Sequence, residues 1–592
     1  LTSATVLDGF RVIGGNSDTL TGSKGIHCKD SSPTIQNNEI YGGRAVSTSS
    51  AIVNQSSSPN ILNNPIISGG LPDGHADGVG GGMDNFAILN QSFSTPIIKG
   101  AESIPNSQGL DSADTTGINQ RITGPAGSSA TYRIKNETSS NAVIEGNIIE
   151  AGDNGGILAV SSSPEIKNNV ITISNTGNTA IRGENTSFKI QSNHIRGGIY
   201  ITSGSLDVDI SNNHRIYGDI TITGISTGVD IHDHVITDKS YATSNGWTYA
   251  DHYGVAKRNV ITGSILFNSH SSGIVKNNSL DGVDHNTGSR SEIYDNFIFS
   301  TKWATIGIYD GSNAEVFRNY IETAREVTDG SAPQNIRILE SHASIYNNIF
   351  YVHNTSSLIG AWALSVVIDS PSAKIIFRNN LFFGNSKGSM TNFHVTYNVE
   401  QSLLFHFSNN VTYNMVSNNN NNPISYYNTF GGHPYLIHRN FIYSHTDSTM
   451  IAYYLDAVAA DTNYNTVADL NGVVQSIMCS SGDCIKSNVD LEPEIDQVTP
   501  VCIWNWQNSC TATAQVKLNS ADIATVDFFL LDFRIPNDSY FKNKGEDPVT
   551  VSNILDDNSL IELDFDGCER NSTSNNSFSI GPYEANERKD CN

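Results

Sequence analysis

Short apolar runs alternate with polar turns along most of the chain. In "GIYITSG" (198–204) and "GDITITG" (218–224), isoleucines occupy every second position, and Gly, Asn or Ser bounds each run. A period of two is typical of a half-buried strand, whereas an amphipathic helix repeats its apolar positions every 3.6 residues. The pattern therefore predicts many short β-strands separated by tight turns.

One motif recurs through these strands. An aliphatic or aromatic residue is followed three positions later by Asn, and then by one or two apolar residues. The motif's asparagines are Asn38, Asn64, Asn147, Asn169, Asn193, Asn213, Asn278, Asn296, Asn319, Asn348, Asn380, Asn410 and Asn440, with Asn259 a weaker member. Most successive copies lie about 20 to 30 residues apart, which is a solenoid period. We therefore expect a right-handed parallel β-helix, with about two or three further coils hidden between Ile61 and Ile144.

The stacking of coils gives each motif position a physical role. Equivalent residues of neighbouring coils lie about 4.8 Å apart, so the Ile and Val positions form apolar columns. We expect the motif Asn to adopt left-handed backbone geometry at the bend and to bond through its amide to the Asn above and below. "SSPTI", "SSPNI" and "SSPEI" each place Ser-Ser-Pro before such a strand. Proline is tolerated at the start of a strand and blocks a helix, so this tripeptide is predicted to begin the next strand.

Two regions follow from the repeat and the cysteines. Residues 1–450 are predicted to form the β-helix, and residues 451–592 a β-rich segment that caps its open edge. Cys28 alternates with Ile26 and is expected to be a small inward-facing residue. The chain has seven cysteines, and those in the last quarter are Cys479, Cys484, Cys502, Cys510, Cys568 and Cys591. Three local disulfides would fit an oxidising compartment, with free buried thiols as the alternative.

The charge excludes some partners. With 59 acidic and 34 basic residues the net charge is −25, which argues against nucleic acid and anionic membranes. No apolar stretch is long enough to predict a membrane span. Leu1 is not an initiator methionine, and we expect any secretion signal to lie upstream of it. These features together predict an extracellular or cell-surface location.

The repeat and the tail resemble a known group of proteins. The Asn-ladder motif and the opening "VLDGFRVIGG" are similar to the pectate-lyase-like superfamily of right-handed β-helix proteins. The tail "DFDGCERN" followed by "FSIGPYEAN" resembles the closing signature of bacterial surface β-helix proteins, through Asp564, Asp566, Gly567, Arg570, Ile580, Gly581, Tyr583 and Glu584. The resemblance implies a secreted or surface β-helix, but the superfamily contains lyases, hydrolases and adhesins, so it does not select an activity.

A polysaccharide lyase on this fold would need a basic residue beside calcium-binding carboxylates, to stabilise the enolate formed at a uronate. Lys276 directly precedes "NNSLDGVDHNTGSRSE" (277–292), which contains Arg290 and supplies Asp281, Asp284 and Glu292. The alternative interpretation of this stretch is a solvated loop.

Two further patterns suggest metal ligands. In "LPDGHADGVGGGMD", Asp73, His75, Asp77 and Asp84 fall at positions 1, 3, 5 and 12 of a Ca²⁺-loop spacing, although a plain glycine-rich loop is the alternative. In "VDIHDHVI", the side chains of Asp230, His232 and His234 share one face of a strand. His194, His214 and His234 lie 20 residues apart and could stack as a column, with ordinary surface histidines as the alternative.

Two classes of function remain. The first is a non-enzymatic surface protein of structural or adhesin type, which binds glycans or other copies of itself. The second is a calcium-dependent lyase that acts on an acidic polysaccharide. The absence from the sequence of a clear catalytic set favours the first.

Overall fold

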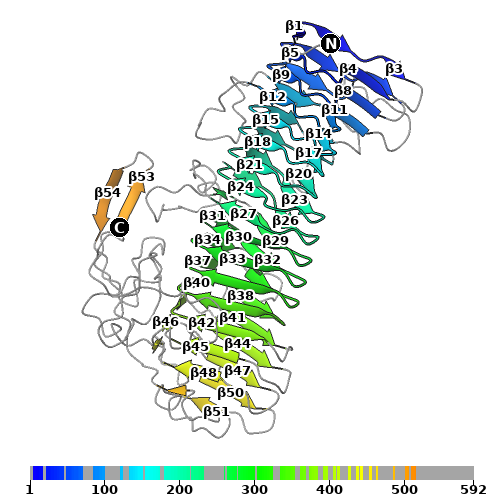
Figure 1. The fold of residues 1–592 in the computed structure, drawn as a ribbon. Coiled ribbons are helices and arrows are strands. Elements are labelled where there is room, and N and C mark those ends of the chain that lie inside the picture. The colour runs from blue at the N-terminus through cyan, green and yellow to red at the C-terminus, as the bar shows by residue number, and fades with distance from the viewer. Residues whose placement is uncertain are drawn as a thin grey trace, which may run out of the picture. The chain divides into compact units, whose positions relative to one another are not determined.

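The computed structural model describes a defined set of residues, most of them in strands (Figure 1). The described residues are 4–17, 22–45, 48–70, 84–100, 120–124, 132–150, 154–173, 179–213, 215–232, 259–260, 263–276, 278–300, 303–324, 334–353, 361–368, 373–384, 391–397, 404–408, 410–413, 424–428, 435–438, 441–443, 452–456, 462–464, 485–486, 501–505 and 509–514. They belong to two compact units: unit 1 comprises Leu1–Trp247 and Val255–Ser279, and unit 2 comprises Thr248–Gly254 and Leu280–Asn592. Every assigned element in this part of the chain is a strand, and it contains no helix capable of crossing a membrane.

Unit 1 is built from three parallel sheets, which the chain visits in turn. Sheet 1 contains β1 (Val6–Asp8), β5 (Thr34–Gln36), β9 (Asn60–Leu62), β12 (Ile97–Lys99), β15 (Val143–Glu145), β18 (Glu165–Lys167), β21 (Lys189–Gln191), β24 (Asp209–Ser211), β27 (Val229–His232) and β30 (Ser272–Lys276). Sheet 2 contains β2 (Arg11–Ile13), β6 (Glu39–Tyr41), β10 (Ile66–Ser68), β13 (Arg121–Thr123), β16 (Ile148–Glu150), β19 (Val170–Thr172), β22 (His194–Arg196) and β25 (Arg215–Tyr217). Sheet 3 contains β4 (Ser23–Lys29), β8 (Thr48–Gln55), β11 (Asp84–Gln91), β14 (Tyr132–Glu137), β17 (Gly155–Val160), β20 (Thr179–Glu184), β23 (Gly198–Thr202), β26 (Ile220–Ile222) and β29 (Ser264–Phe267). β3 (Asn16–Ser17) and β7 (Arg44–Ala45) form a separate two-stranded parallel sheet. β28 (Asn259–Val260) is parallel to β31 (Asn278–Leu280), and both belong to a larger parallel sheet.

Unit 2 repeats the arrangement with longer strands. Its sheet 1 contains β33 (Arg290–Tyr294), β36 (Asn313–Phe317), β39 (His342–Tyr346), β42 (Lys374–Arg378), β45 (Leu404–Ser408), β48 (Tyr435–His438) and β52 (Ile485–Lys486). Its sheet 2 contains β34 (Phe297–Ser300), β37 (Tyr320–Ala324), β40 (Ile349–His353), β43 (Leu381–Gly384), β46 (Val411–Tyr413) and β49 (Phe441–Tyr443). Its sheet 3 contains β32 (Gly282–His285), β35 (Ala304–Ile308), β38 (Gln334–Leu339), β41 (Ala361–Ile368), β44 (Thr391–Tyr397), β47 (Ile424–Asn428), β50 (Ala452–Asp456) and β51 (Thr462–Tyr464). β51 pairs antiparallel with β50, and β53 (Val501–Asn505) forms an antiparallel pair with β54 (Ser509–Ala514).

The predicted parallel β-helix is confirmed, and its core consists of aliphatic columns. Ile144, Ile166 and Ile190 are register partners on β15, β18 and β21, and each is fully buried. β-Branched side chains suit such a column because they pack well on a pleated surface. Phenylalanines also enter the interior of both units, and in unit 2 the rings of Phe350 and Phe382 stack with centroids 4.7 Å apart.

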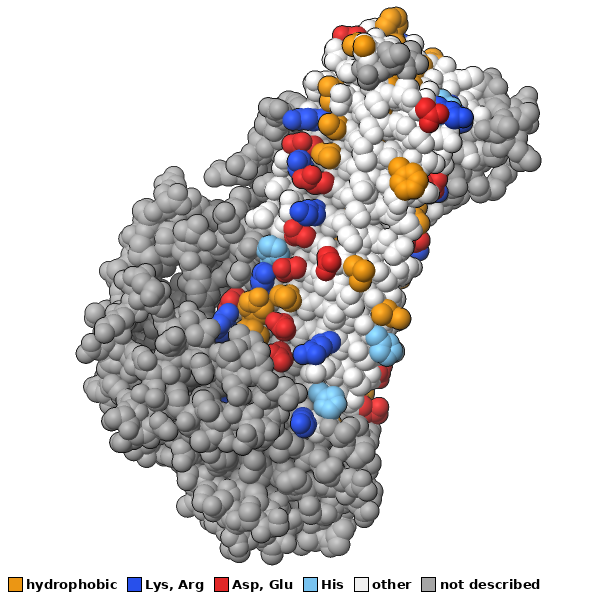
Figure 2. All heavy atoms as spheres, in the orientation of Figure 1, with side chains coloured by type: hydrophobic (Ala, Val, Ile, Leu, Met, Phe, Trp, Pro, Cys, Tyr) orange, Lys and Arg blue, Asp and Glu red, His pale blue; other side chains and the backbone are white. Residues whose placement is uncertain are grey.

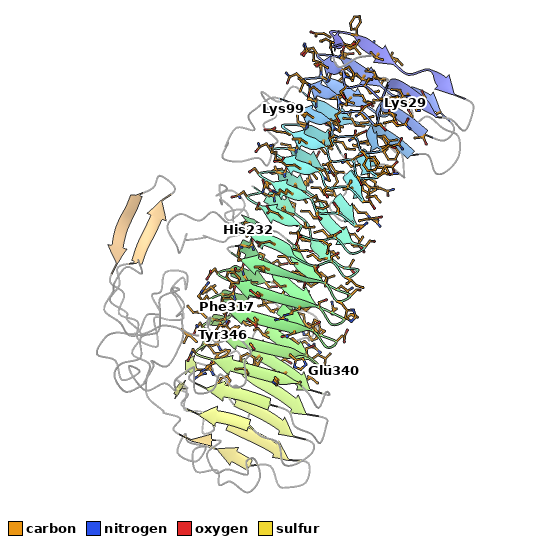
Figure 3. All side chains as sticks on the ribbon, in the orientation of Figure 1. Lys29, Lys99, His232, Phe317, Glu340 and Tyr346 are labelled. Atoms are coloured by element: carbon orange, nitrogen blue, oxygen red, sulfur yellow. The ribbon has the colours of Figure 1, made fainter. Side chains whose placement is uncertain are left out.

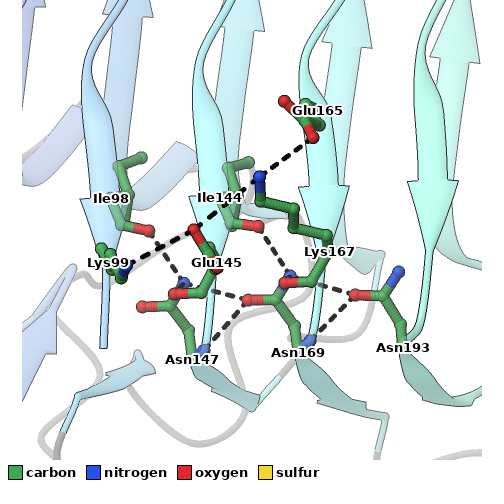
Figure 4. A network of polar contacts seen from close by, with 9 residues as sticks. All are labelled: Ile98, Lys99, Ile144, Glu145, Asn147, Glu165, Lys167, Asn169 and Asn193. Carbon is green, nitrogen blue, oxygen red and sulfur yellow. Dashed lines mark hydrogen bonds and ion pairs between the residues drawn. The ribbon is translucent and has the colours of Figure 1, made fainter. Parts of the chain in front are cut away.

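The Asn ladder is also confirmed, and Figure 4 shows part of it. The backbone N–H and the Nδ2 of Asn147 both donate to Oδ1 of Asn169, at 3.0 Å each. Asn169 donates in the same way to Asn193. Each Nδ2 also reaches main-chain oxygens, which for Asn169 are those of Ile144 and Lys167, both at 2.8 Å. Polar groups buried at the turn are thereby satisfied. In unit 2 the ladder runs through Asn296, Asn319, Asn348, Asn380 and Asn410.

The structure corrects the prediction that one Asn both bends the chain and forms the ladder. The left-handed residue is the one that precedes the ladder Asn: Asn37 has φ 54° and Asn168 has φ 54°. Where the pair is not Asn-Asn, other residues take the bend, such as Ser192 with φ 55° and Gly146 with φ 66°. The two asparagines of the motif therefore have separate roles: the first bends the chain and the second forms the ladder. Asparagine suits the bend because it adopts left-handed backbone geometry more readily than most residues.

The prediction of two or three hidden coils between Ile61 and Ile144 was wrong. β12 pairs directly with β9 on one side and β15 on the other, so one coil lies between them. The ladder residue of that coil is Gln120, which accepts from Asn64 and donates to Oδ1 of Asn147 at 2.7 Å. The remaining length falls largely in 71–83, 101–119 and 125–131, outside the described residues.

Ser-Ser-Pro has a second function besides starting the strand. Thr34 begins β5 directly after Pro33, as expected. The hydroxyl of Ser57 accepts the backbone N–H of Ser31, and the hydroxyl of Ser94 accepts that of Ser57, each at 3.2 Å. These buried hydroxyls form a serine ladder at the corner that leads into sheet 1.

The cysteines are described only in part. Cys28 is 1% exposed, which confirms an inward-facing position, and burial raises the pKa of its thiol to about 11. The side chains of Cys479, Cys484, Cys502, Cys510, Cys568 and Cys591 lie outside the described residues, and the described part contains no disulfide. The disulfide-bearing cap and the boundary at residue 450 stay predictions.

Candidate functional site

The calcium loop falls almost wholly outside the described residues. Asp73, His75 and Asp77 lie in 71–83, and of Asp84 only the backbone is described, at the start of β11 beside Thr48. Among the residues that the structure describes, no three His, Cys, Asp or Glu side chains gather as metal ligands.

The lyase candidates occupy different elements. In unit 2, Asp284 lies on β32 of sheet 3, whereas Arg290 begins β33 of sheet 1 and is exposed. Asp281 comes just before β32, and Glu292 on β33 is the register partner of Glu315. In unit 1, the ammonium of Lys276 donates to Oδ2 of Asp230 at 3.0 Å.

The register of sheet 2 does not stack His194 on His214, as the expected histidine column requires. Although the ladder aligns Asn193 with Asn213, the partner of His194 on β25 is Arg215. His194 is buried, and its ring lies 5.6 Å from that of Tyr217. His214 and His234 lie outside the described residues.

The structure brings together residues that the sequence assigned to separate sites. On β24, β27 and β30 of unit 1, Nε2 of His232 lies 3.5 Å from Oδ1 of Asp209 and 3.7 Å from Oδ2 of Asp230. Lys276 contacts the same oxygen of Asp230. Figure 3 labels His232 in this region. We call Asp209, Asp230, His232 and Lys276 the Asp–His–Lys cluster.

Hydrogen bonds control the charge state of Asp209. Burial alone would raise the pKa of this carboxyl, but hydrogen bonds from His232, Ser211 and Gln191, together with the charge of His232, outweigh it and lower the pKa. Gln191 Nε2 donates to Oδ2 of Asp209 at 2.8 Å. The carboxylate is therefore ionised at neutral pH.

The cluster continues a longer row of polar side chains along sheet 1 of unit 1 (Figures 2 and 4). Nζ of Lys167 lies 3.0 Å from Oε1 of Glu165 and 3.9 Å from Oε2 of Glu145, and Nζ of Lys99 also lies 3.9 Å from Glu145. The register places these positions on consecutive strands. We define the sheet 1 strip as Lys99, Glu145, Glu165, Lys167, Lys189, Gln191, Asp209, Asp230, His232 and Lys276.

The strip is electrically balanced although the whole chain is acidic. It contains four lysines and four carboxylates, whereas the net charge of the chain is −25. Its ion pairs are partly exposed, with 30% of the Lys167 side chain and 20% of the Glu145 side chain accessible. Such pairs contribute little to stability, about 0 to 1 kcal/mol each, so stability alone does not account for the strip. Donors and acceptors alternate from Lys99 through Glu145 to Lys167, whereas Asp209 and Asp230 are adjacent register partners.

Comparison with known proteins adds no assignment. No model of a known protein family matches the chain, and no curated protein matches it significantly.

Proposed function

We propose that the chain is an extracellular or cell-surface β-solenoid protein that binds glycans along the sheet 1 strip without cleaving them. The observation that carries this proposal is the register of the strip, in which Lys99, Glu145 and Lys167 follow one another on β12, β15 and β18. Adjacent strands are about 4.8 Å apart, so a polymer along the stack would meet a donor or an acceptor at each step. Sugar hydroxyls both donate and accept, which suits this alternation.

The charge of the strip favours a neutral polysaccharide. A polyanion would meet the carboxylates of Glu145, Glu165, Asp209 and Asp230 as well as the lysines, and the acidic chain would repel it further. A neutral glycan meets no such opposition and can replace the water on both kinds of group.

The calcium-dependent lyase is supported less well. Lys276, the basic residue of unit 1 suggested for that chemistry, is already bound to the Asp230 carboxylate at 3.0 Å. A base that abstracts a proton from a uronate must be free of such a contact and must lie next to the substrate.

Affinity gel electrophoresis tests the proposal. The native chain is run through gels that contain galactomannan, hydroxyethyl cellulose, pectate or alginate, and we expect a neutral polymer to retard it. The double substitution Glu145→Ala and Lys167→Ala leaves the strip neutral but removes its central pair, and we expect about tenfold weaker binding from the lost hydrogen bonds.

The matched control is Arg11→Ala with Glu39→Ala, which removes an exposed ion pair of 3.4 Å from sheet 2 of the same unit. This control should bind as the native chain does. Migration of the native chain unchanged by every polymer would overturn the proposal, and equal losses in the two double variants would overturn the role of the strip.

A further inference from the structure

Unit 2 carries a compact group of aromatic and charged side chains on sheet 3. Asp284 on β32, Gly307 on β35 and Arg337 on β38 are register partners. Trp303 comes immediately before β35, and Tyr309 immediately after it. We call Asp284, Trp303, Gly307, Tyr309 and Arg337 the Trp303 cluster.

The indole of Trp303 is both exposed and fixed in place. Trp303 is 37% exposed, which is unusual for an aromatic residue of this size. The guanidinium carbon of Arg337 lies 3.7 Å from the ring centroid, so one face of the indole is covered by a stacked cation. A cation–π contact of this kind holds the ring in one orientation and leaves its exposed surface available.

Gly307 lets a polar surface form beside the indole. A Cβ at this position would lie 2.3 Å from Cε2 of Tyr309, 2.4 Å from Oδ1 of Asp284 and 2.6 Å from the Tyr309 hydroxyl. The Tyr309 ring therefore packs directly over Gly307, with its hydroxyl near the Asp284 carboxylate. Burial, together with the charge of Asp284, raises the pKa of Tyr309 to about 12 against the opposing effect of Arg337, so the phenol stays protonated.

Arg337 positions the indole rather than a ligand hydroxyl. Its Nε is buried and finds no acceptor among the described residues, so this donor is not accessible to a ligand. Arg337 and Asp284 together carry one positive and one negative charge, so the cluster is neutral. Gly307 lies between them in register, and the carboxylate of Asp284 is the acceptor of the cluster.

We propose that the Trp303 cluster is a binding subsite for a single neutral sugar residue, with the apolar face of the sugar on the part of the indole that Arg337 leaves exposed and its hydroxyls on Tyr309 and Asp284. An aromatic platform beside a few placed polar groups is the usual composition of a small-molecule site. The balanced charge selects a neutral sugar over a uronate or an amine. This inference rests on the proposed function for the class of ligand, but it places a binding site in unit 2 rather than on the strip of unit 1.

Full-length variants test the subsite with galactomannan and hydroxyethyl cellulose. We expect Trp303→Ala to weaken binding about tenfold or more, because it removes the stacking platform. Arg337→Lys keeps the charge but loses the planar stack and should give an intermediate loss. Phe93→Ala, which removes another exposed aromatic side chain (71% exposed) in unit 1, should bind normally.

Tryptophan fluorescence gives a readout that does not depend on alanine truncation. Polysaccharide should change the emission of the native chain, and Trp303→Phe should retain most of the binding while losing that change. Thermal unfolding of each variant reports whether it is folded.

The outcomes separate this inference from the proposed function. If Trp303→Ala and Trp303→Phe behave as the native chain in both assays while the Glu145→Ala and Lys167→Ala double variant loses binding, the subsite is wrong and the strip stands. If Trp303→Ala loses binding and the double variant keeps it, the subsite stands and the strip is wrong. If neither polymer binds the native chain, the subsite is overturned.

Discussion

At the scale of single residues, the fold depends on amides that satisfy buried turns. Asn169 is fully buried, and its amide group joins the coils on both sides. Asn168, its neighbour in the sequence, instead supplies a left-handed bend with φ 54°. Adjacent, chemically identical side chains therefore have different energetic roles.

This division predicts unequal effects of two neighbouring substitutions. Asn169→Ala leaves the N–H of Asn147 and the carbonyls of Ile144 and Lys167 without their amide partner, and should lower the free energy of unfolding by about 3 kcal/mol. Asn168→Gly keeps the left-handed backbone accessible and should cost much less. Urea denaturation followed by circular dichroism measures both, and equal losses would contradict the assigned roles.

At the scale of elements, strand β32 of unit 2 places a titratable ring in the interior. His285 is fully buried; its Nδ1 lies 3.1 Å from the carbonyl oxygen of Gly307 on β35 and its Nε2 2.5 Å from the hydroxyl of Ser291 on β33. The carbonyl can only accept, so Nδ1 carries the proton and Nε2 accepts from Ser291. Burial lowers the pKa of His285 to about 4, although the hydrogen bond to Gly307 opposes the shift.

Unit 2 should consequently lose stability in mild acid. The pKa of His285 is lower in the folded chain than in the unfolded chain, where it is about 6.5. Neutral His285 therefore makes its full contribution to the free energy of unfolding above pH 6.5. This contribution is lost as the pH falls from 6.5 through about 4, and amounts to about 3 kcal/mol.

Urea denaturation between pH 7 and pH 4.5 checks this expectation. His285→Gln should be less stable at pH 7 but should lose less stability on acidification. His270→Gln, which removes an exposed imidazole from unit 1, is the control for the substitution itself. If the free energy of unfolding of the His285→Gln variant fell with pH as steeply as that of the native chain, His285 would not be the cause of the acid sensitivity.

At the scale of the molecule, the sequence predicts the features that recur in every coil, but not the contacts that occur once. The Ile columns and most ladder asparagines could be located because each coil repeats the same local pattern. Gln120 was missed because glutamine replaces asparagine and the aliphatic residue three positions before it is absent, since Gly117 stands there. Lys276 and Asp230 are 46 residues apart in the sequence, and no period predicts their contact because residues 233–258 interrupt the repeat.

The Trp303 cluster was missed for a related reason. Trp303 and Arg337 come from neighbouring coils, and their contact depends on the register of β35 against β38 rather than on any local motif. The serine ladder could have been predicted, because the repeated Ser-Ser pairs mark it in the sequence.

Incubation of the native chain with pectate, alginate and glycosaminoglycans, alongside the neutral polymers, tests most directly whether the protein binds glycans without cleaving them. Ultraviolet absorbance detects unsaturated uronates, and gel retardation in parallel reports binding. We predict retardation by a neutral polymer and constant absorbance with every acidic one. A rise in absorbance that disappears in the Lys276→Ala variant would contradict the account and assign the Asp–His–Lys cluster to a lyase.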